Sequence, residues 1–408
     1  MAYCFDEIID RGENSKAHSC KWEGYAKLFP GLEVSNTIPK WVADMDFRVA
    51  DEILEAMDSR LKHGIFGYVS DAGVHAFAAA CCDWLARRQA VSDKPEQMLF
   101  SPGVRCGLNA VIQAFTKLGD GVIIHTPVYY PFADGIKENG RVPVRNALRL
   151  VNGVYAIDFE ELERFVKNPE NTMMILSSPH NPGGRVWTKD ELRRIAELCL
   201  ENDVFLFSDE IHCDLVMPGH EHTSLLAVYD RIAEHAIVAY APSKTFNLAG
   251  LCAALMVVPD ENNRERLRAQ LSRNKAPGAN TFGLVAGEAA YVYGDRFADE
   301  VVRYIQKNAE RFENILSDVP GTHCMRLEGT YLLWVDFNGT GCEEQDIYRT
   351  IVEHGGVAPD LGAWFGPGGE GFARFNIACP RSIVERAASQ IRDAFLERNR
   401  RRMKCMLL

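Results

Sequence analysis

Five short apolar runs mark the middle of the chain, and each ends in a polar or proline-containing loop. They lie at residues 98–100, 122–126, 173–177, 204–208 and 237–240. Runs that are apolar at successive positions are typical of strands buried on both faces, as in a largely parallel sheet covered by helices. The pattern therefore predicts such a sheet.

Helical periodicity alternates with these runs. After the first run, apolar side chains recur at helical spacing at Leu108, Val111, Ile112 and Phe115. We expect Ser101 to cap this helix, with Pro102 in its first turn. Thr188 and Glu191 form a capping box before another periodic segment, which predicts a second helix there. The middle of the chain is predicted to be α/β.

The character of the chain changes after about residue 290, where the alternation of strand and helix ends. A long polar-faced helix through 303–316 is followed by a strand at 331–337, a glycine-rich stretch at 362–371, a further strand and a final helix. Residues 1–47 show no core of their own. We therefore predict a large α/β domain over residues 48–289 and a small α+β domain built from 1–47 and 290–408.

Composition narrows the classes of function. The 408 residues are 47% hydrophobic and 25% charged, with a net charge of −11, which fits a folded globular protein and disfavours nucleic acid and anionic membranes as partners. The N-terminus carries acidic residues where a signal peptide needs basic ones, so a cytoplasmic location is expected. The twelve cysteines are scattered and predict reduced core residues; no metal site is predicted.

The loops after the apolar runs carry the candidate chemistry, because ligands of open α/β sheets collect beyond the carboxyl ends of the strands. They contain Ser-Pro-Gly-Val-Arg (101–105), Pro-Val-Tyr-Tyr (127–130), Pro-His-Asn-Pro-Gly-Gly-Arg (179–185), Asp-Glu-Ile-His (209–212) and Ser-Lys-Thr-Phe-Asn (243–247). A glycine at a helix N-terminus suits an anion, and a lysine can condense with an aldehyde. These groups fit pyridoxal phosphate, whose ring nitrogen needs an acidic partner.

The same loops resemble those of the fold-type I pyridoxal-phosphate enzymes, the aspartate aminotransferase superfamily. Within it, the chain is similar to the carbon–sulfur β-lyase branch, which includes cystathionine β-lyases of the MalY/PatB type and cystalysin. The matching segments are 38–47, 66–68, 178–185, 208–212, 241–247 and 374–378. The resemblance implies an aspartate-aminotransferase-like fold with a large, mostly parallel-sheet cofactor domain, a smaller α+β domain, and a homodimer.

The resemblance also implies how the cofactor ring would be held. Lys244 forms the Schiff base, Asp209 pairs with the pyridinium nitrogen, and Asn181 hydrogen-bonds the phenolate oxygen. Tyr129 lies over the ring, so that Lys244, Tyr129 and Asp209 are the predicted catalytic residues. His212 stands where many aminotransferases have a tyrosine; it either contacts the cofactor or is a histidine satisfied in the core.

The predicted phosphate ligands are the backbone of Gly103, Val104 and Arg105 and the hydroxyl of Ser243. Tyr68 of the neighbouring subunit is implied to complete the site. Related lyases usually have an apolar residue at position 105, so Arg105 either strengthens phosphate binding or points away. Aminotransferases commonly place an arginine eight residues after the lysine, where this chain has Cys252.

The predicted substrate is a sulfur amino acid. Arg374 binds its α-carboxylate, since a guanidinium forms two parallel hydrogen bonds with a carboxylate; Asn181 and the backbone at Ala43 assist. Tyr130 either lies near the leaving group or packs. The implied reaction is α,β-elimination of cystathionine, cysteine or cystine to a thiol, pyruvate and ammonia. An aminotransferase is the alternative because it shares the first steps, and a regulatory protein on the same fold is a less favoured third interpretation.

Overall fold

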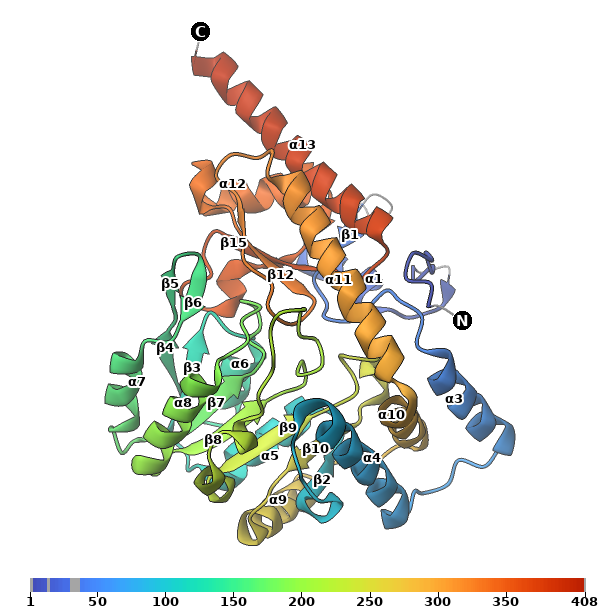
Figure 1. The fold of residues 1–408 in the computed structure, drawn as a ribbon. Coiled ribbons are helices and arrows are strands. Elements are labelled where there is room, and N and C mark those ends of the chain that lie inside the picture. The colour runs from blue at the N-terminus through green and yellow to red at the C-terminus, as the bar shows by residue number, and fades with distance from the viewer. Residues whose placement is uncertain (1–2, 13–14, 30–36, 407–408) are drawn as a thin grey trace.

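The chain folds around two separate sheets, which lie one above the other in Figure 1. The computed structural model describes residues 3–12, 15–29 and 37–406. The described residues form a larger sheet of seven strands in the order β2-β10-β9-β8-β7-β3-β4. Its strands are β2 (Met98–Ser101), β3 (Gly121–Thr126), β4 (Val142–Ala147), β7 (Asn171–Ser177), β8 (Phe205–Asp209), β9 (Ala236–Tyr240) and β10 (Ala254–Val257).

Helices cover both faces of this sheet because neighbouring strand residues point to opposite sides. In β3, Val122 and Ile124 pack into one core and Ile123 into the other. The first core is closed by α5 (Val104–Phe115), α6 (Pro131–Glu138) and α9 (Glu261–Arg273). The second is closed by α4 (Asp71–Gln89), α7 (Phe159–Val166), α8 (Lys189–Glu201) and α10 (Thr281–Tyr293).

The predicted strands are confirmed. All five apolar runs are strands of the larger sheet, and only β10 runs antiparallel to its neighbours β2 and β9 within that described sheet. Two strands of the larger sheet were not predicted. The edge strand β4 has mostly exposed or half-buried residues, and β10 follows a loop that carries Cys252.

The predicted helix cap at Ser101 is wrong. Ser101 is the buried last residue of β2, and its hydroxyl donates to the Gly103 carbonyl. Gly103 is the N-cap of α5, at a φ of 92°. A residue with a side chain rarely adopts this backbone conformation, so glycine makes the turn from strand to helix. The capping box of Thr188 and Glu191 is confirmed at the start of α8.

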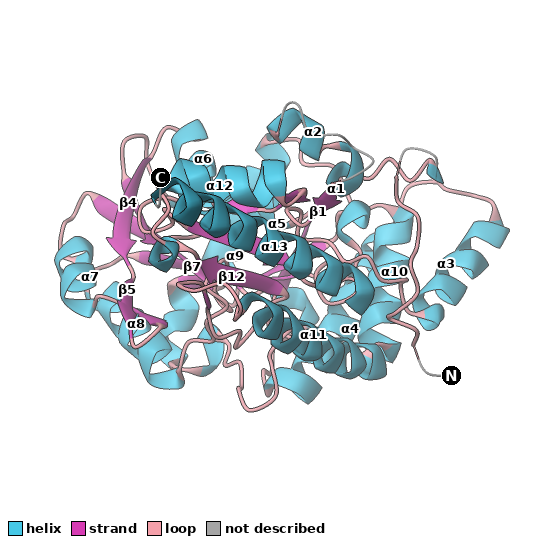
Figure 2. Ribbon diagram, turned by 90° about the horizontal axis from the view of Figure 1, so that it is seen from above, coloured by secondary structure: helices cyan, strands magenta, loops and turns pink. Residues whose placement is uncertain are grey.

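The smaller sheet is antiparallel and lies beside the long C-terminal helices. Within the described residues it has four strands in the order β11-β12-β15-β14. They are β11 (His323–Cys324), β12 (Leu332–Asp336), β14 (Asp360–Leu361) and β15 (Phe372–Asn376). The helices of this region are α11 (Asp295–Leu316), α12 (Glu344–Arg349) and α13 (Arg381–Met406); α11 and α13 run side by side in Figure 2.

The N-terminal segment contacts the C-terminal region, as the sequence predicts. β1 (Ile38–Pro39) pairs in parallel with β13 (Val357–Ala358). The Asp46 amide donates to the Ala378 carbonyl at 2.8 Å. Before β1 lie the short helices α1 (Cys20–Glu23) and α2 (Tyr25–Leu28). The division into domains at residues 47 and 289 stays a prediction; residue 289 lies within α10.

Two peripheral elements complete the fold. The hairpin of β5 (Arg149–Val151) and β6 (Val154–Ala156) extends from the larger sheet, and α3 (Asp51–His63) packs on α10. Across the described residues, no helix is long and apolar enough to cross a membrane, and no group of three metal-ligating side chains occurs. The cysteines of that part of the chain form no disulfide.

Candidate active site

The loops singled out in the sequence meet at one edge of the larger sheet. Strands β3, β7, β8 and β9 are parallel, so their carboxyl ends share this edge. The end of β8 supplies Asp209, and the loop after β9 supplies Lys244. A backbone hydrogen bond of 3.0 Å from the Tyr129 amide to the Asn181 carbonyl joins the loops after β3 and β7. The sheet thus gathers side chains that are far apart in the sequence.

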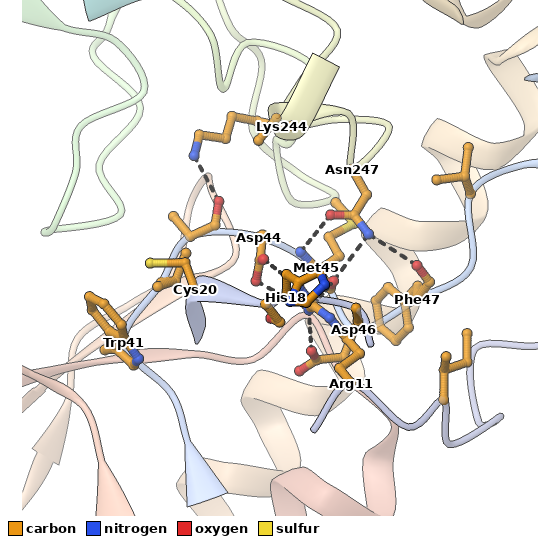
Figure 3. A pocket seen from close by; sticks show the side chains of 18 of the residues that line it. Arg11, His18, Cys20, Trp41, Asp44, Met45, Asp46, Phe47, Lys244 and Asn247 are labelled. Carbon is orange, nitrogen blue, oxygen red and sulfur yellow. Dashed lines mark hydrogen bonds and ion pairs between the residues drawn. The ribbon is translucent and has the colours of Figure 1, made fainter. Parts of the chain in front are cut away.

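Lys244 reaches across to the N-terminal segment. Its Nζ donates to the Ala43 carbonyl at 2.7 Å, as Figure 3 shows. The Tyr331 hydroxyl donates to the same carbonyl at 2.8 Å. Burial, together with the nearby Arg374 cation, lowers the pKa of Lys244 from 10.5 to about 8. A substantial fraction of this amine is therefore neutral near pH 8 and able to act as a nucleophile or base.

Asp209 is a nearly buried carboxylate with little to hold its charge. It is 7% exposed, and within the described chain its one hydrogen bond comes from the Ile211 amide, 3.3 Å from Oδ1. Burial raises its pKa from 3.8 to about 7. A buried carboxylate of this kind is stabilised by a cationic partner. The position therefore suits a protonated ring nitrogen.

Arg374 lies on β15 and is held by three groups. Its Nη1 donates to Asn181 Oδ1 at 2.8 Å, and its Nη2 donates to the Trp41 carbonyl at 2.9 Å and to Asp360. Arg374 is 2% exposed and Asp360 is 1% exposed. Because a guanidinium held at several points keeps one orientation, Arg374 can present its remaining donors in a fixed direction.

The ion pair between Arg374 and Asp360 leaves one polar atom of each residue without a hydrogen-bond partner in the described chain. Arg374 Nε and Asp360 Oδ1 are buried and have no hydrogen-bond partner among residues 3–12, 15–29 and 37–406. Both residues line a cavity of about 780 Å³, together with Lys244 and Tyr129. Buried polar groups are almost always paired in folded proteins. Arg374 therefore has a donor that its protein partners do not use, on a side chain that lines this cavity.

A strap formed by residues 41–47 closes one side of the cavity. Asn376 Nδ2 donates to the Val42 carbonyl at 2.6 Å, and Asn247 bonds the backbone of Met45 through both side-chain atoms, at 2.9 and 3.0 Å. Arg11 bonds the Asp44 carboxylate at 2.6 Å, as Figure 3 shows. These positioning residues were not predicted, because nothing in the sequence links them to the strap.

The turn from β2 into α5 leaves donors available. The backbone N–H groups of Val104 and Arg105 lie in the first turn of α5, where an α-helix has no partner for them, and no hydrogen bond from either reaches a described residue. Space beside Gly103 is open. The side chain of Arg105 is exposed. These features suit a phosphate group at the helix N-terminus.

Tyr129 and Tyr130 lie on the wall of the cavity. Burial raises the pKa of Tyr129, while the cations of Arg374 and Arg105 oppose that rise. Tyr129 is therefore within electrostatic range of both arginines. Tyr130 packs edge-on against Phe365, with ring centres 5.6 Å apart. The packing interpretation of Tyr130 fits this contact, and both tyrosines are half-buried.

His212 is buried close to the reacting groups. Its ring packs edge-on against Tyr331 at 5.7 Å, and its Nδ1 has no hydrogen-bond partner in the described chain. Burial and the cations of Lys244 and Arg374 hold the pKa of His212 well below its usual range. The histidine is therefore neutral at physiological pH. Its role toward a cofactor stays a prediction.

Two predicted site residues, Tyr68 and Ser243, do not line the cavity, and neither does Cys252. Tyr68 is fully exposed on the loop after α3. Ser243 is half-buried in the loop after β9, and no described residue bonds its hydroxyl. Cys252 is exposed, with Sγ against the carbonyls of Ala249 and Gly250. The position where aminotransferases commonly have an arginine thus provides no cation.

The fold, together with Lys244, Asp209 and Arg374, indicates the class of protein. Residues 42–391 match the family model of aminotransferase class I and II, and the chain belongs to this family. The family resemblance inferred from the loops is confirmed, as is the fold class.

Comparisons with individual proteins narrow the class to the cystathionine β-lyase branch. The chain is 40% identical to cystathionine beta-lyase PatB of Bacillus subtilis over 385 residues, covering 94% of this chain and 98% of PatB. It is 30% identical to protein MalY of Escherichia coli, over 96% of this chain and 98% of MalY. Cystalysin from Treponema denticola, whose crystal structure contains pyridoxal 5′-phosphate, superposes with a TM-score of 0.93 at 33% identity over 97% of this chain and 100% of cystalysin.

Proposed function

We propose that this protein is a pyridoxal-phosphate-dependent carbon–sulfur β-lyase. It converts a sulfur amino acid such as cystathionine, and water, into a thiol, pyruvate and ammonia. The observation that carries the proposal is the meeting of Lys244 and Arg374 at one cavity, with Asp209 within electrostatic range of Lys244. The activities named for PatB and cystalysin's bound cofactor support it.

The residues present fit this cofactor. Lys244 is a partly buried amine with a lowered pKa of about 8, and Asp209 is a buried carboxylate with one described hydrogen bond. The backbone N–H groups of Val104 and Arg105, which bond no described residue, suit its phosphate. We assign the extra charge needed at the phosphate to Arg105, because Cys252 supplies none. Ser243 is assigned to the same phosphate.

The cofactor, when bound, supplies an electron-withdrawing ring that takes up the electron pair released at Cα. The carboxylate of Asp209 keeps the ring nitrogen protonated. Arg374 binds the substrate α-carboxylate, and Asn181 and Asp360 fix the orientation of its guanidinium. The Nζ of Lys244 accepts the Cα proton, which its depressed pKa permits near neutral pH.

The volume and lining of the cavity also fit the leaving group of the substrate. A volume of about 780 Å³ accommodates a thioether side chain longer than that of cysteine, within the usual range for small-molecule sites. The phenol rings of Tyr129 and Tyr130 line this space. We assign Tyr129 to the ring face and Tyr130 to the region of the leaving thiol. Cleavage of the Cβ–S bond sends the electron pair to sulfur, which leaves as a thiolate.

An aminotransferase is the second candidate because the matching family is named for that reaction. One assay separates the two. We expect pyruvate from cystathionine in the absence of any keto acid. No pyruvate, together with glutamate formed when 2-oxoglutarate is added, would overturn the lyase proposal and favour the aminotransferase.

We further propose that two copies of the chain build each site. The last turn of α3 exposes Leu61, and the loop after it exposes Ile65, Phe66 and Tyr68, an apolar surface of the kind that a partner covers. Tyr68 would then reach the cofactor of the second copy. The cytoplasmic location expected from the sequence stays a prediction.

Mixing two inactive variants tests the shared site. In a hybrid of Tyr68→Ala and Lys244→Ala protomers, one site keeps both residues and the other has neither. Random reassembly should therefore restore about a quarter of the wild-type activity, because half of the dimers are hybrids with one intact site each. Recovery of no activity from a mixture whose hybrids are verified by mass would reject the contribution of Tyr68.

A further inference from the structure

A buried lysine and a buried cysteine meet behind the strap. Lys40 follows β1, and Cys379 lies three residues after the end of β15. The Lys40 Nζ and the Cys379 Sγ are 2.6 Å apart, and both residues are 0% exposed. Sulfur is larger than nitrogen or oxygen, so this separation is short for a hydrogen bond to sulfur.

Lys40 has an unusual partner for a buried amine. Buried lysines are normally paired with carboxylates, yet Cys379 Sγ is the one hydrogen-bond partner of the Lys40 Nζ in the described parts of the chain. The two carboxylates nearby, Asp44 and Asp46, are bound by Arg11 and Lys21 instead. Burial raises the pKa of the Cys379 thiol, although Lys40 opposes that rise.

A second nitrogen–sulfur contact provides a comparison within the same molecule. Arg398 Nη1 is 2.7 Å from Cys342 Sγ. A guanidinium stays protonated and is a poor nucleophile, and Arg398 also bonds Asp346. The pair of Lys40 and Cys379 differs because an amine can lose its proton and form a covalent bond.

We propose that Lys40 and Cys379 form a reversible covalent N–O–S bridge, with dioxygen as the oxidant. The neutral amine loses one hydrogen and the thiol loses its hydrogen, while one N–O and one O–S bond form. One oxygen atom of dioxygen enters the bridge, and the other leaves with the two hydrogens as water. Nitrogen and sulfur together lose four electrons, which dioxygen accepts.

Reduction reverses the change with the same balance. Two dithiol molecules supply four electrons and four hydrogens, which restore the amine and the thiol and release the bridging oxygen as water. Dioxygen is a small apolar molecule, and small apolar molecules enter protein interiors. The absence of exposed surface at this pair therefore does not prevent the oxidation.

The bridge would fasten the strap to the strand that carries Arg374. The Asn376 amide already donates to the Lys40 carbonyl at 2.8 Å, and the Lys40 amide donates to the Ala358 carbonyl at 2.7 Å. A cross-link between residues 40 and 379 closes most of the chain into a loop, and closing a long loop stabilises a fold by restricting the unfolded state. The expected consequence is a higher melting temperature. This inference does not depend on the proposed lyase activity.

Mass spectrometry of the full-length protein tests the bridge. Wild-type protein is held in dioxygen-saturated buffer, denatured without reductant, and compared with an anaerobic sample. We expect a mass gain of one oxygen atom less two hydrogen atoms. Trypsin should fail to cleave after Lys40, and the peptides containing Lys40 and Cys379 should appear linked. Dithiothreitol should reverse all three changes.

Three variants serve as matched controls. Cys379→Ser removes the sulfur with little change in volume, and Lys40→Arg keeps the charge but removes the nucleophilic amine. Neither should gain this mass, and Cys342→Ser should gain it as the wild type does. The melting temperature should rise on oxygenation in the wild type and stay constant in Cys379→Ser.

Three results would overturn the proposal. The first is an unchanged wild-type mass after exposure to dioxygen. The second is a gain of whole oxygen atoms without a linked peptide, which would indicate a sulfenic or sulfinic acid. The third is the predicted mass gain in Cys379→Ser, which would place the oxidation elsewhere.

Discussion

The two ends of the active site are built in opposite ways. At the carboxylate end, formed by Arg374, Asn181 and Asp360, protein groups already hold the key side chain at three points. At the ring end, formed by Val104, Asp209 and Ser243, the Val104 N–H and the Ser243 hydroxyl have no protein partner in the described chain, and the Asp209 carboxylate accepts one hydrogen bond. An end with many open polar groups suits a ligand that stays bound. An end held by the protein suits a substrate that comes and goes.

Removing charge at the ring end should have the largest effect. Asp209→Ala should raise the activation free energy by about 3–4 kcal/mol and so lower kcat, as the loss of a key electrostatic group does. Steady-state kinetics at saturating pyridoxal phosphate measure the change, and Asp209→Glu should retain part of the activity. Activity of Asp209→Ala within a few-fold of the wild type would mean that the ring end does not depend on this carboxylate.

The carboxylate end should respond through substrate affinity. Arg374→Lys keeps the positive charge but loses the planar fork that matches a carboxylate. We expect the substrate to bind more weakly by about 1.5–3 kcal/mol, the usual contribution of a hydrogen bond to a charged group. KM should rise accordingly. A smaller change should appear in kcat. An unchanged KM would show that the substrate carboxylate binds elsewhere.

Cofactor loading should depend on pH through Lys244. Its pKa of about 8 lies below the ordinary value of 10.5, and only the neutral amine attacks an aldehyde. Loss of the proton as pH rises therefore increases the reactive fraction. The rate of loading of cofactor-free protein should increase about tenfold per pH unit below pH 8 and level off above it, measured by visible absorbance. A rate that still rises steeply from pH 9 to 10 would contradict the lowered pKa.

The smallest expected effect concerns Asp360, which orients Arg374. Asp360→Ala should weaken substrate binding by about 1 kcal/mol, the typical contribution of one hydrogen bond. KM should therefore rise, while kcat stays near the wild-type value. Asp360→Asn should stay closer to the wild type, because its amide oxygen still accepts from Nη2. A purely structural role would instead lower the melting temperature of both variants without this split between KM and kcat.

The sequence predicts the ring end better than the carboxylate end. Asp209 ends β8 and Lys244 lies in the loop after β9, so their place at the sheet edge follows from local pattern and the topology rule for ligands. Arg374 was assigned by resemblance alone. Asp360, Asn247 and Asn376 carry no local signal, since each acts through contacts between segments that are far apart in the sequence.

Local patterns also have limits where the backbone makes a turn. Ser101 has the chemistry of a helix cap but is the last residue of β2. The N-cap of α5 is instead Gly103, two residues later, at a φ of 92°. Similarly, the pairing of β1 with β13 joins residues more than three hundred positions apart, and no hydrophobic periodicity encodes such a contact.

The central claim is that the amine of residue 244 carries the cofactor. Protein loaded with pyridoxal phosphate is treated with borohydride, digested and mapped by mass spectrometry. We predict the reduced pyridoxyl adduct on Lys244 in the wild type and its loss in Lys244→Ala. An adduct on another lysine, or none in a protein that retains its fold, would contradict the assignment.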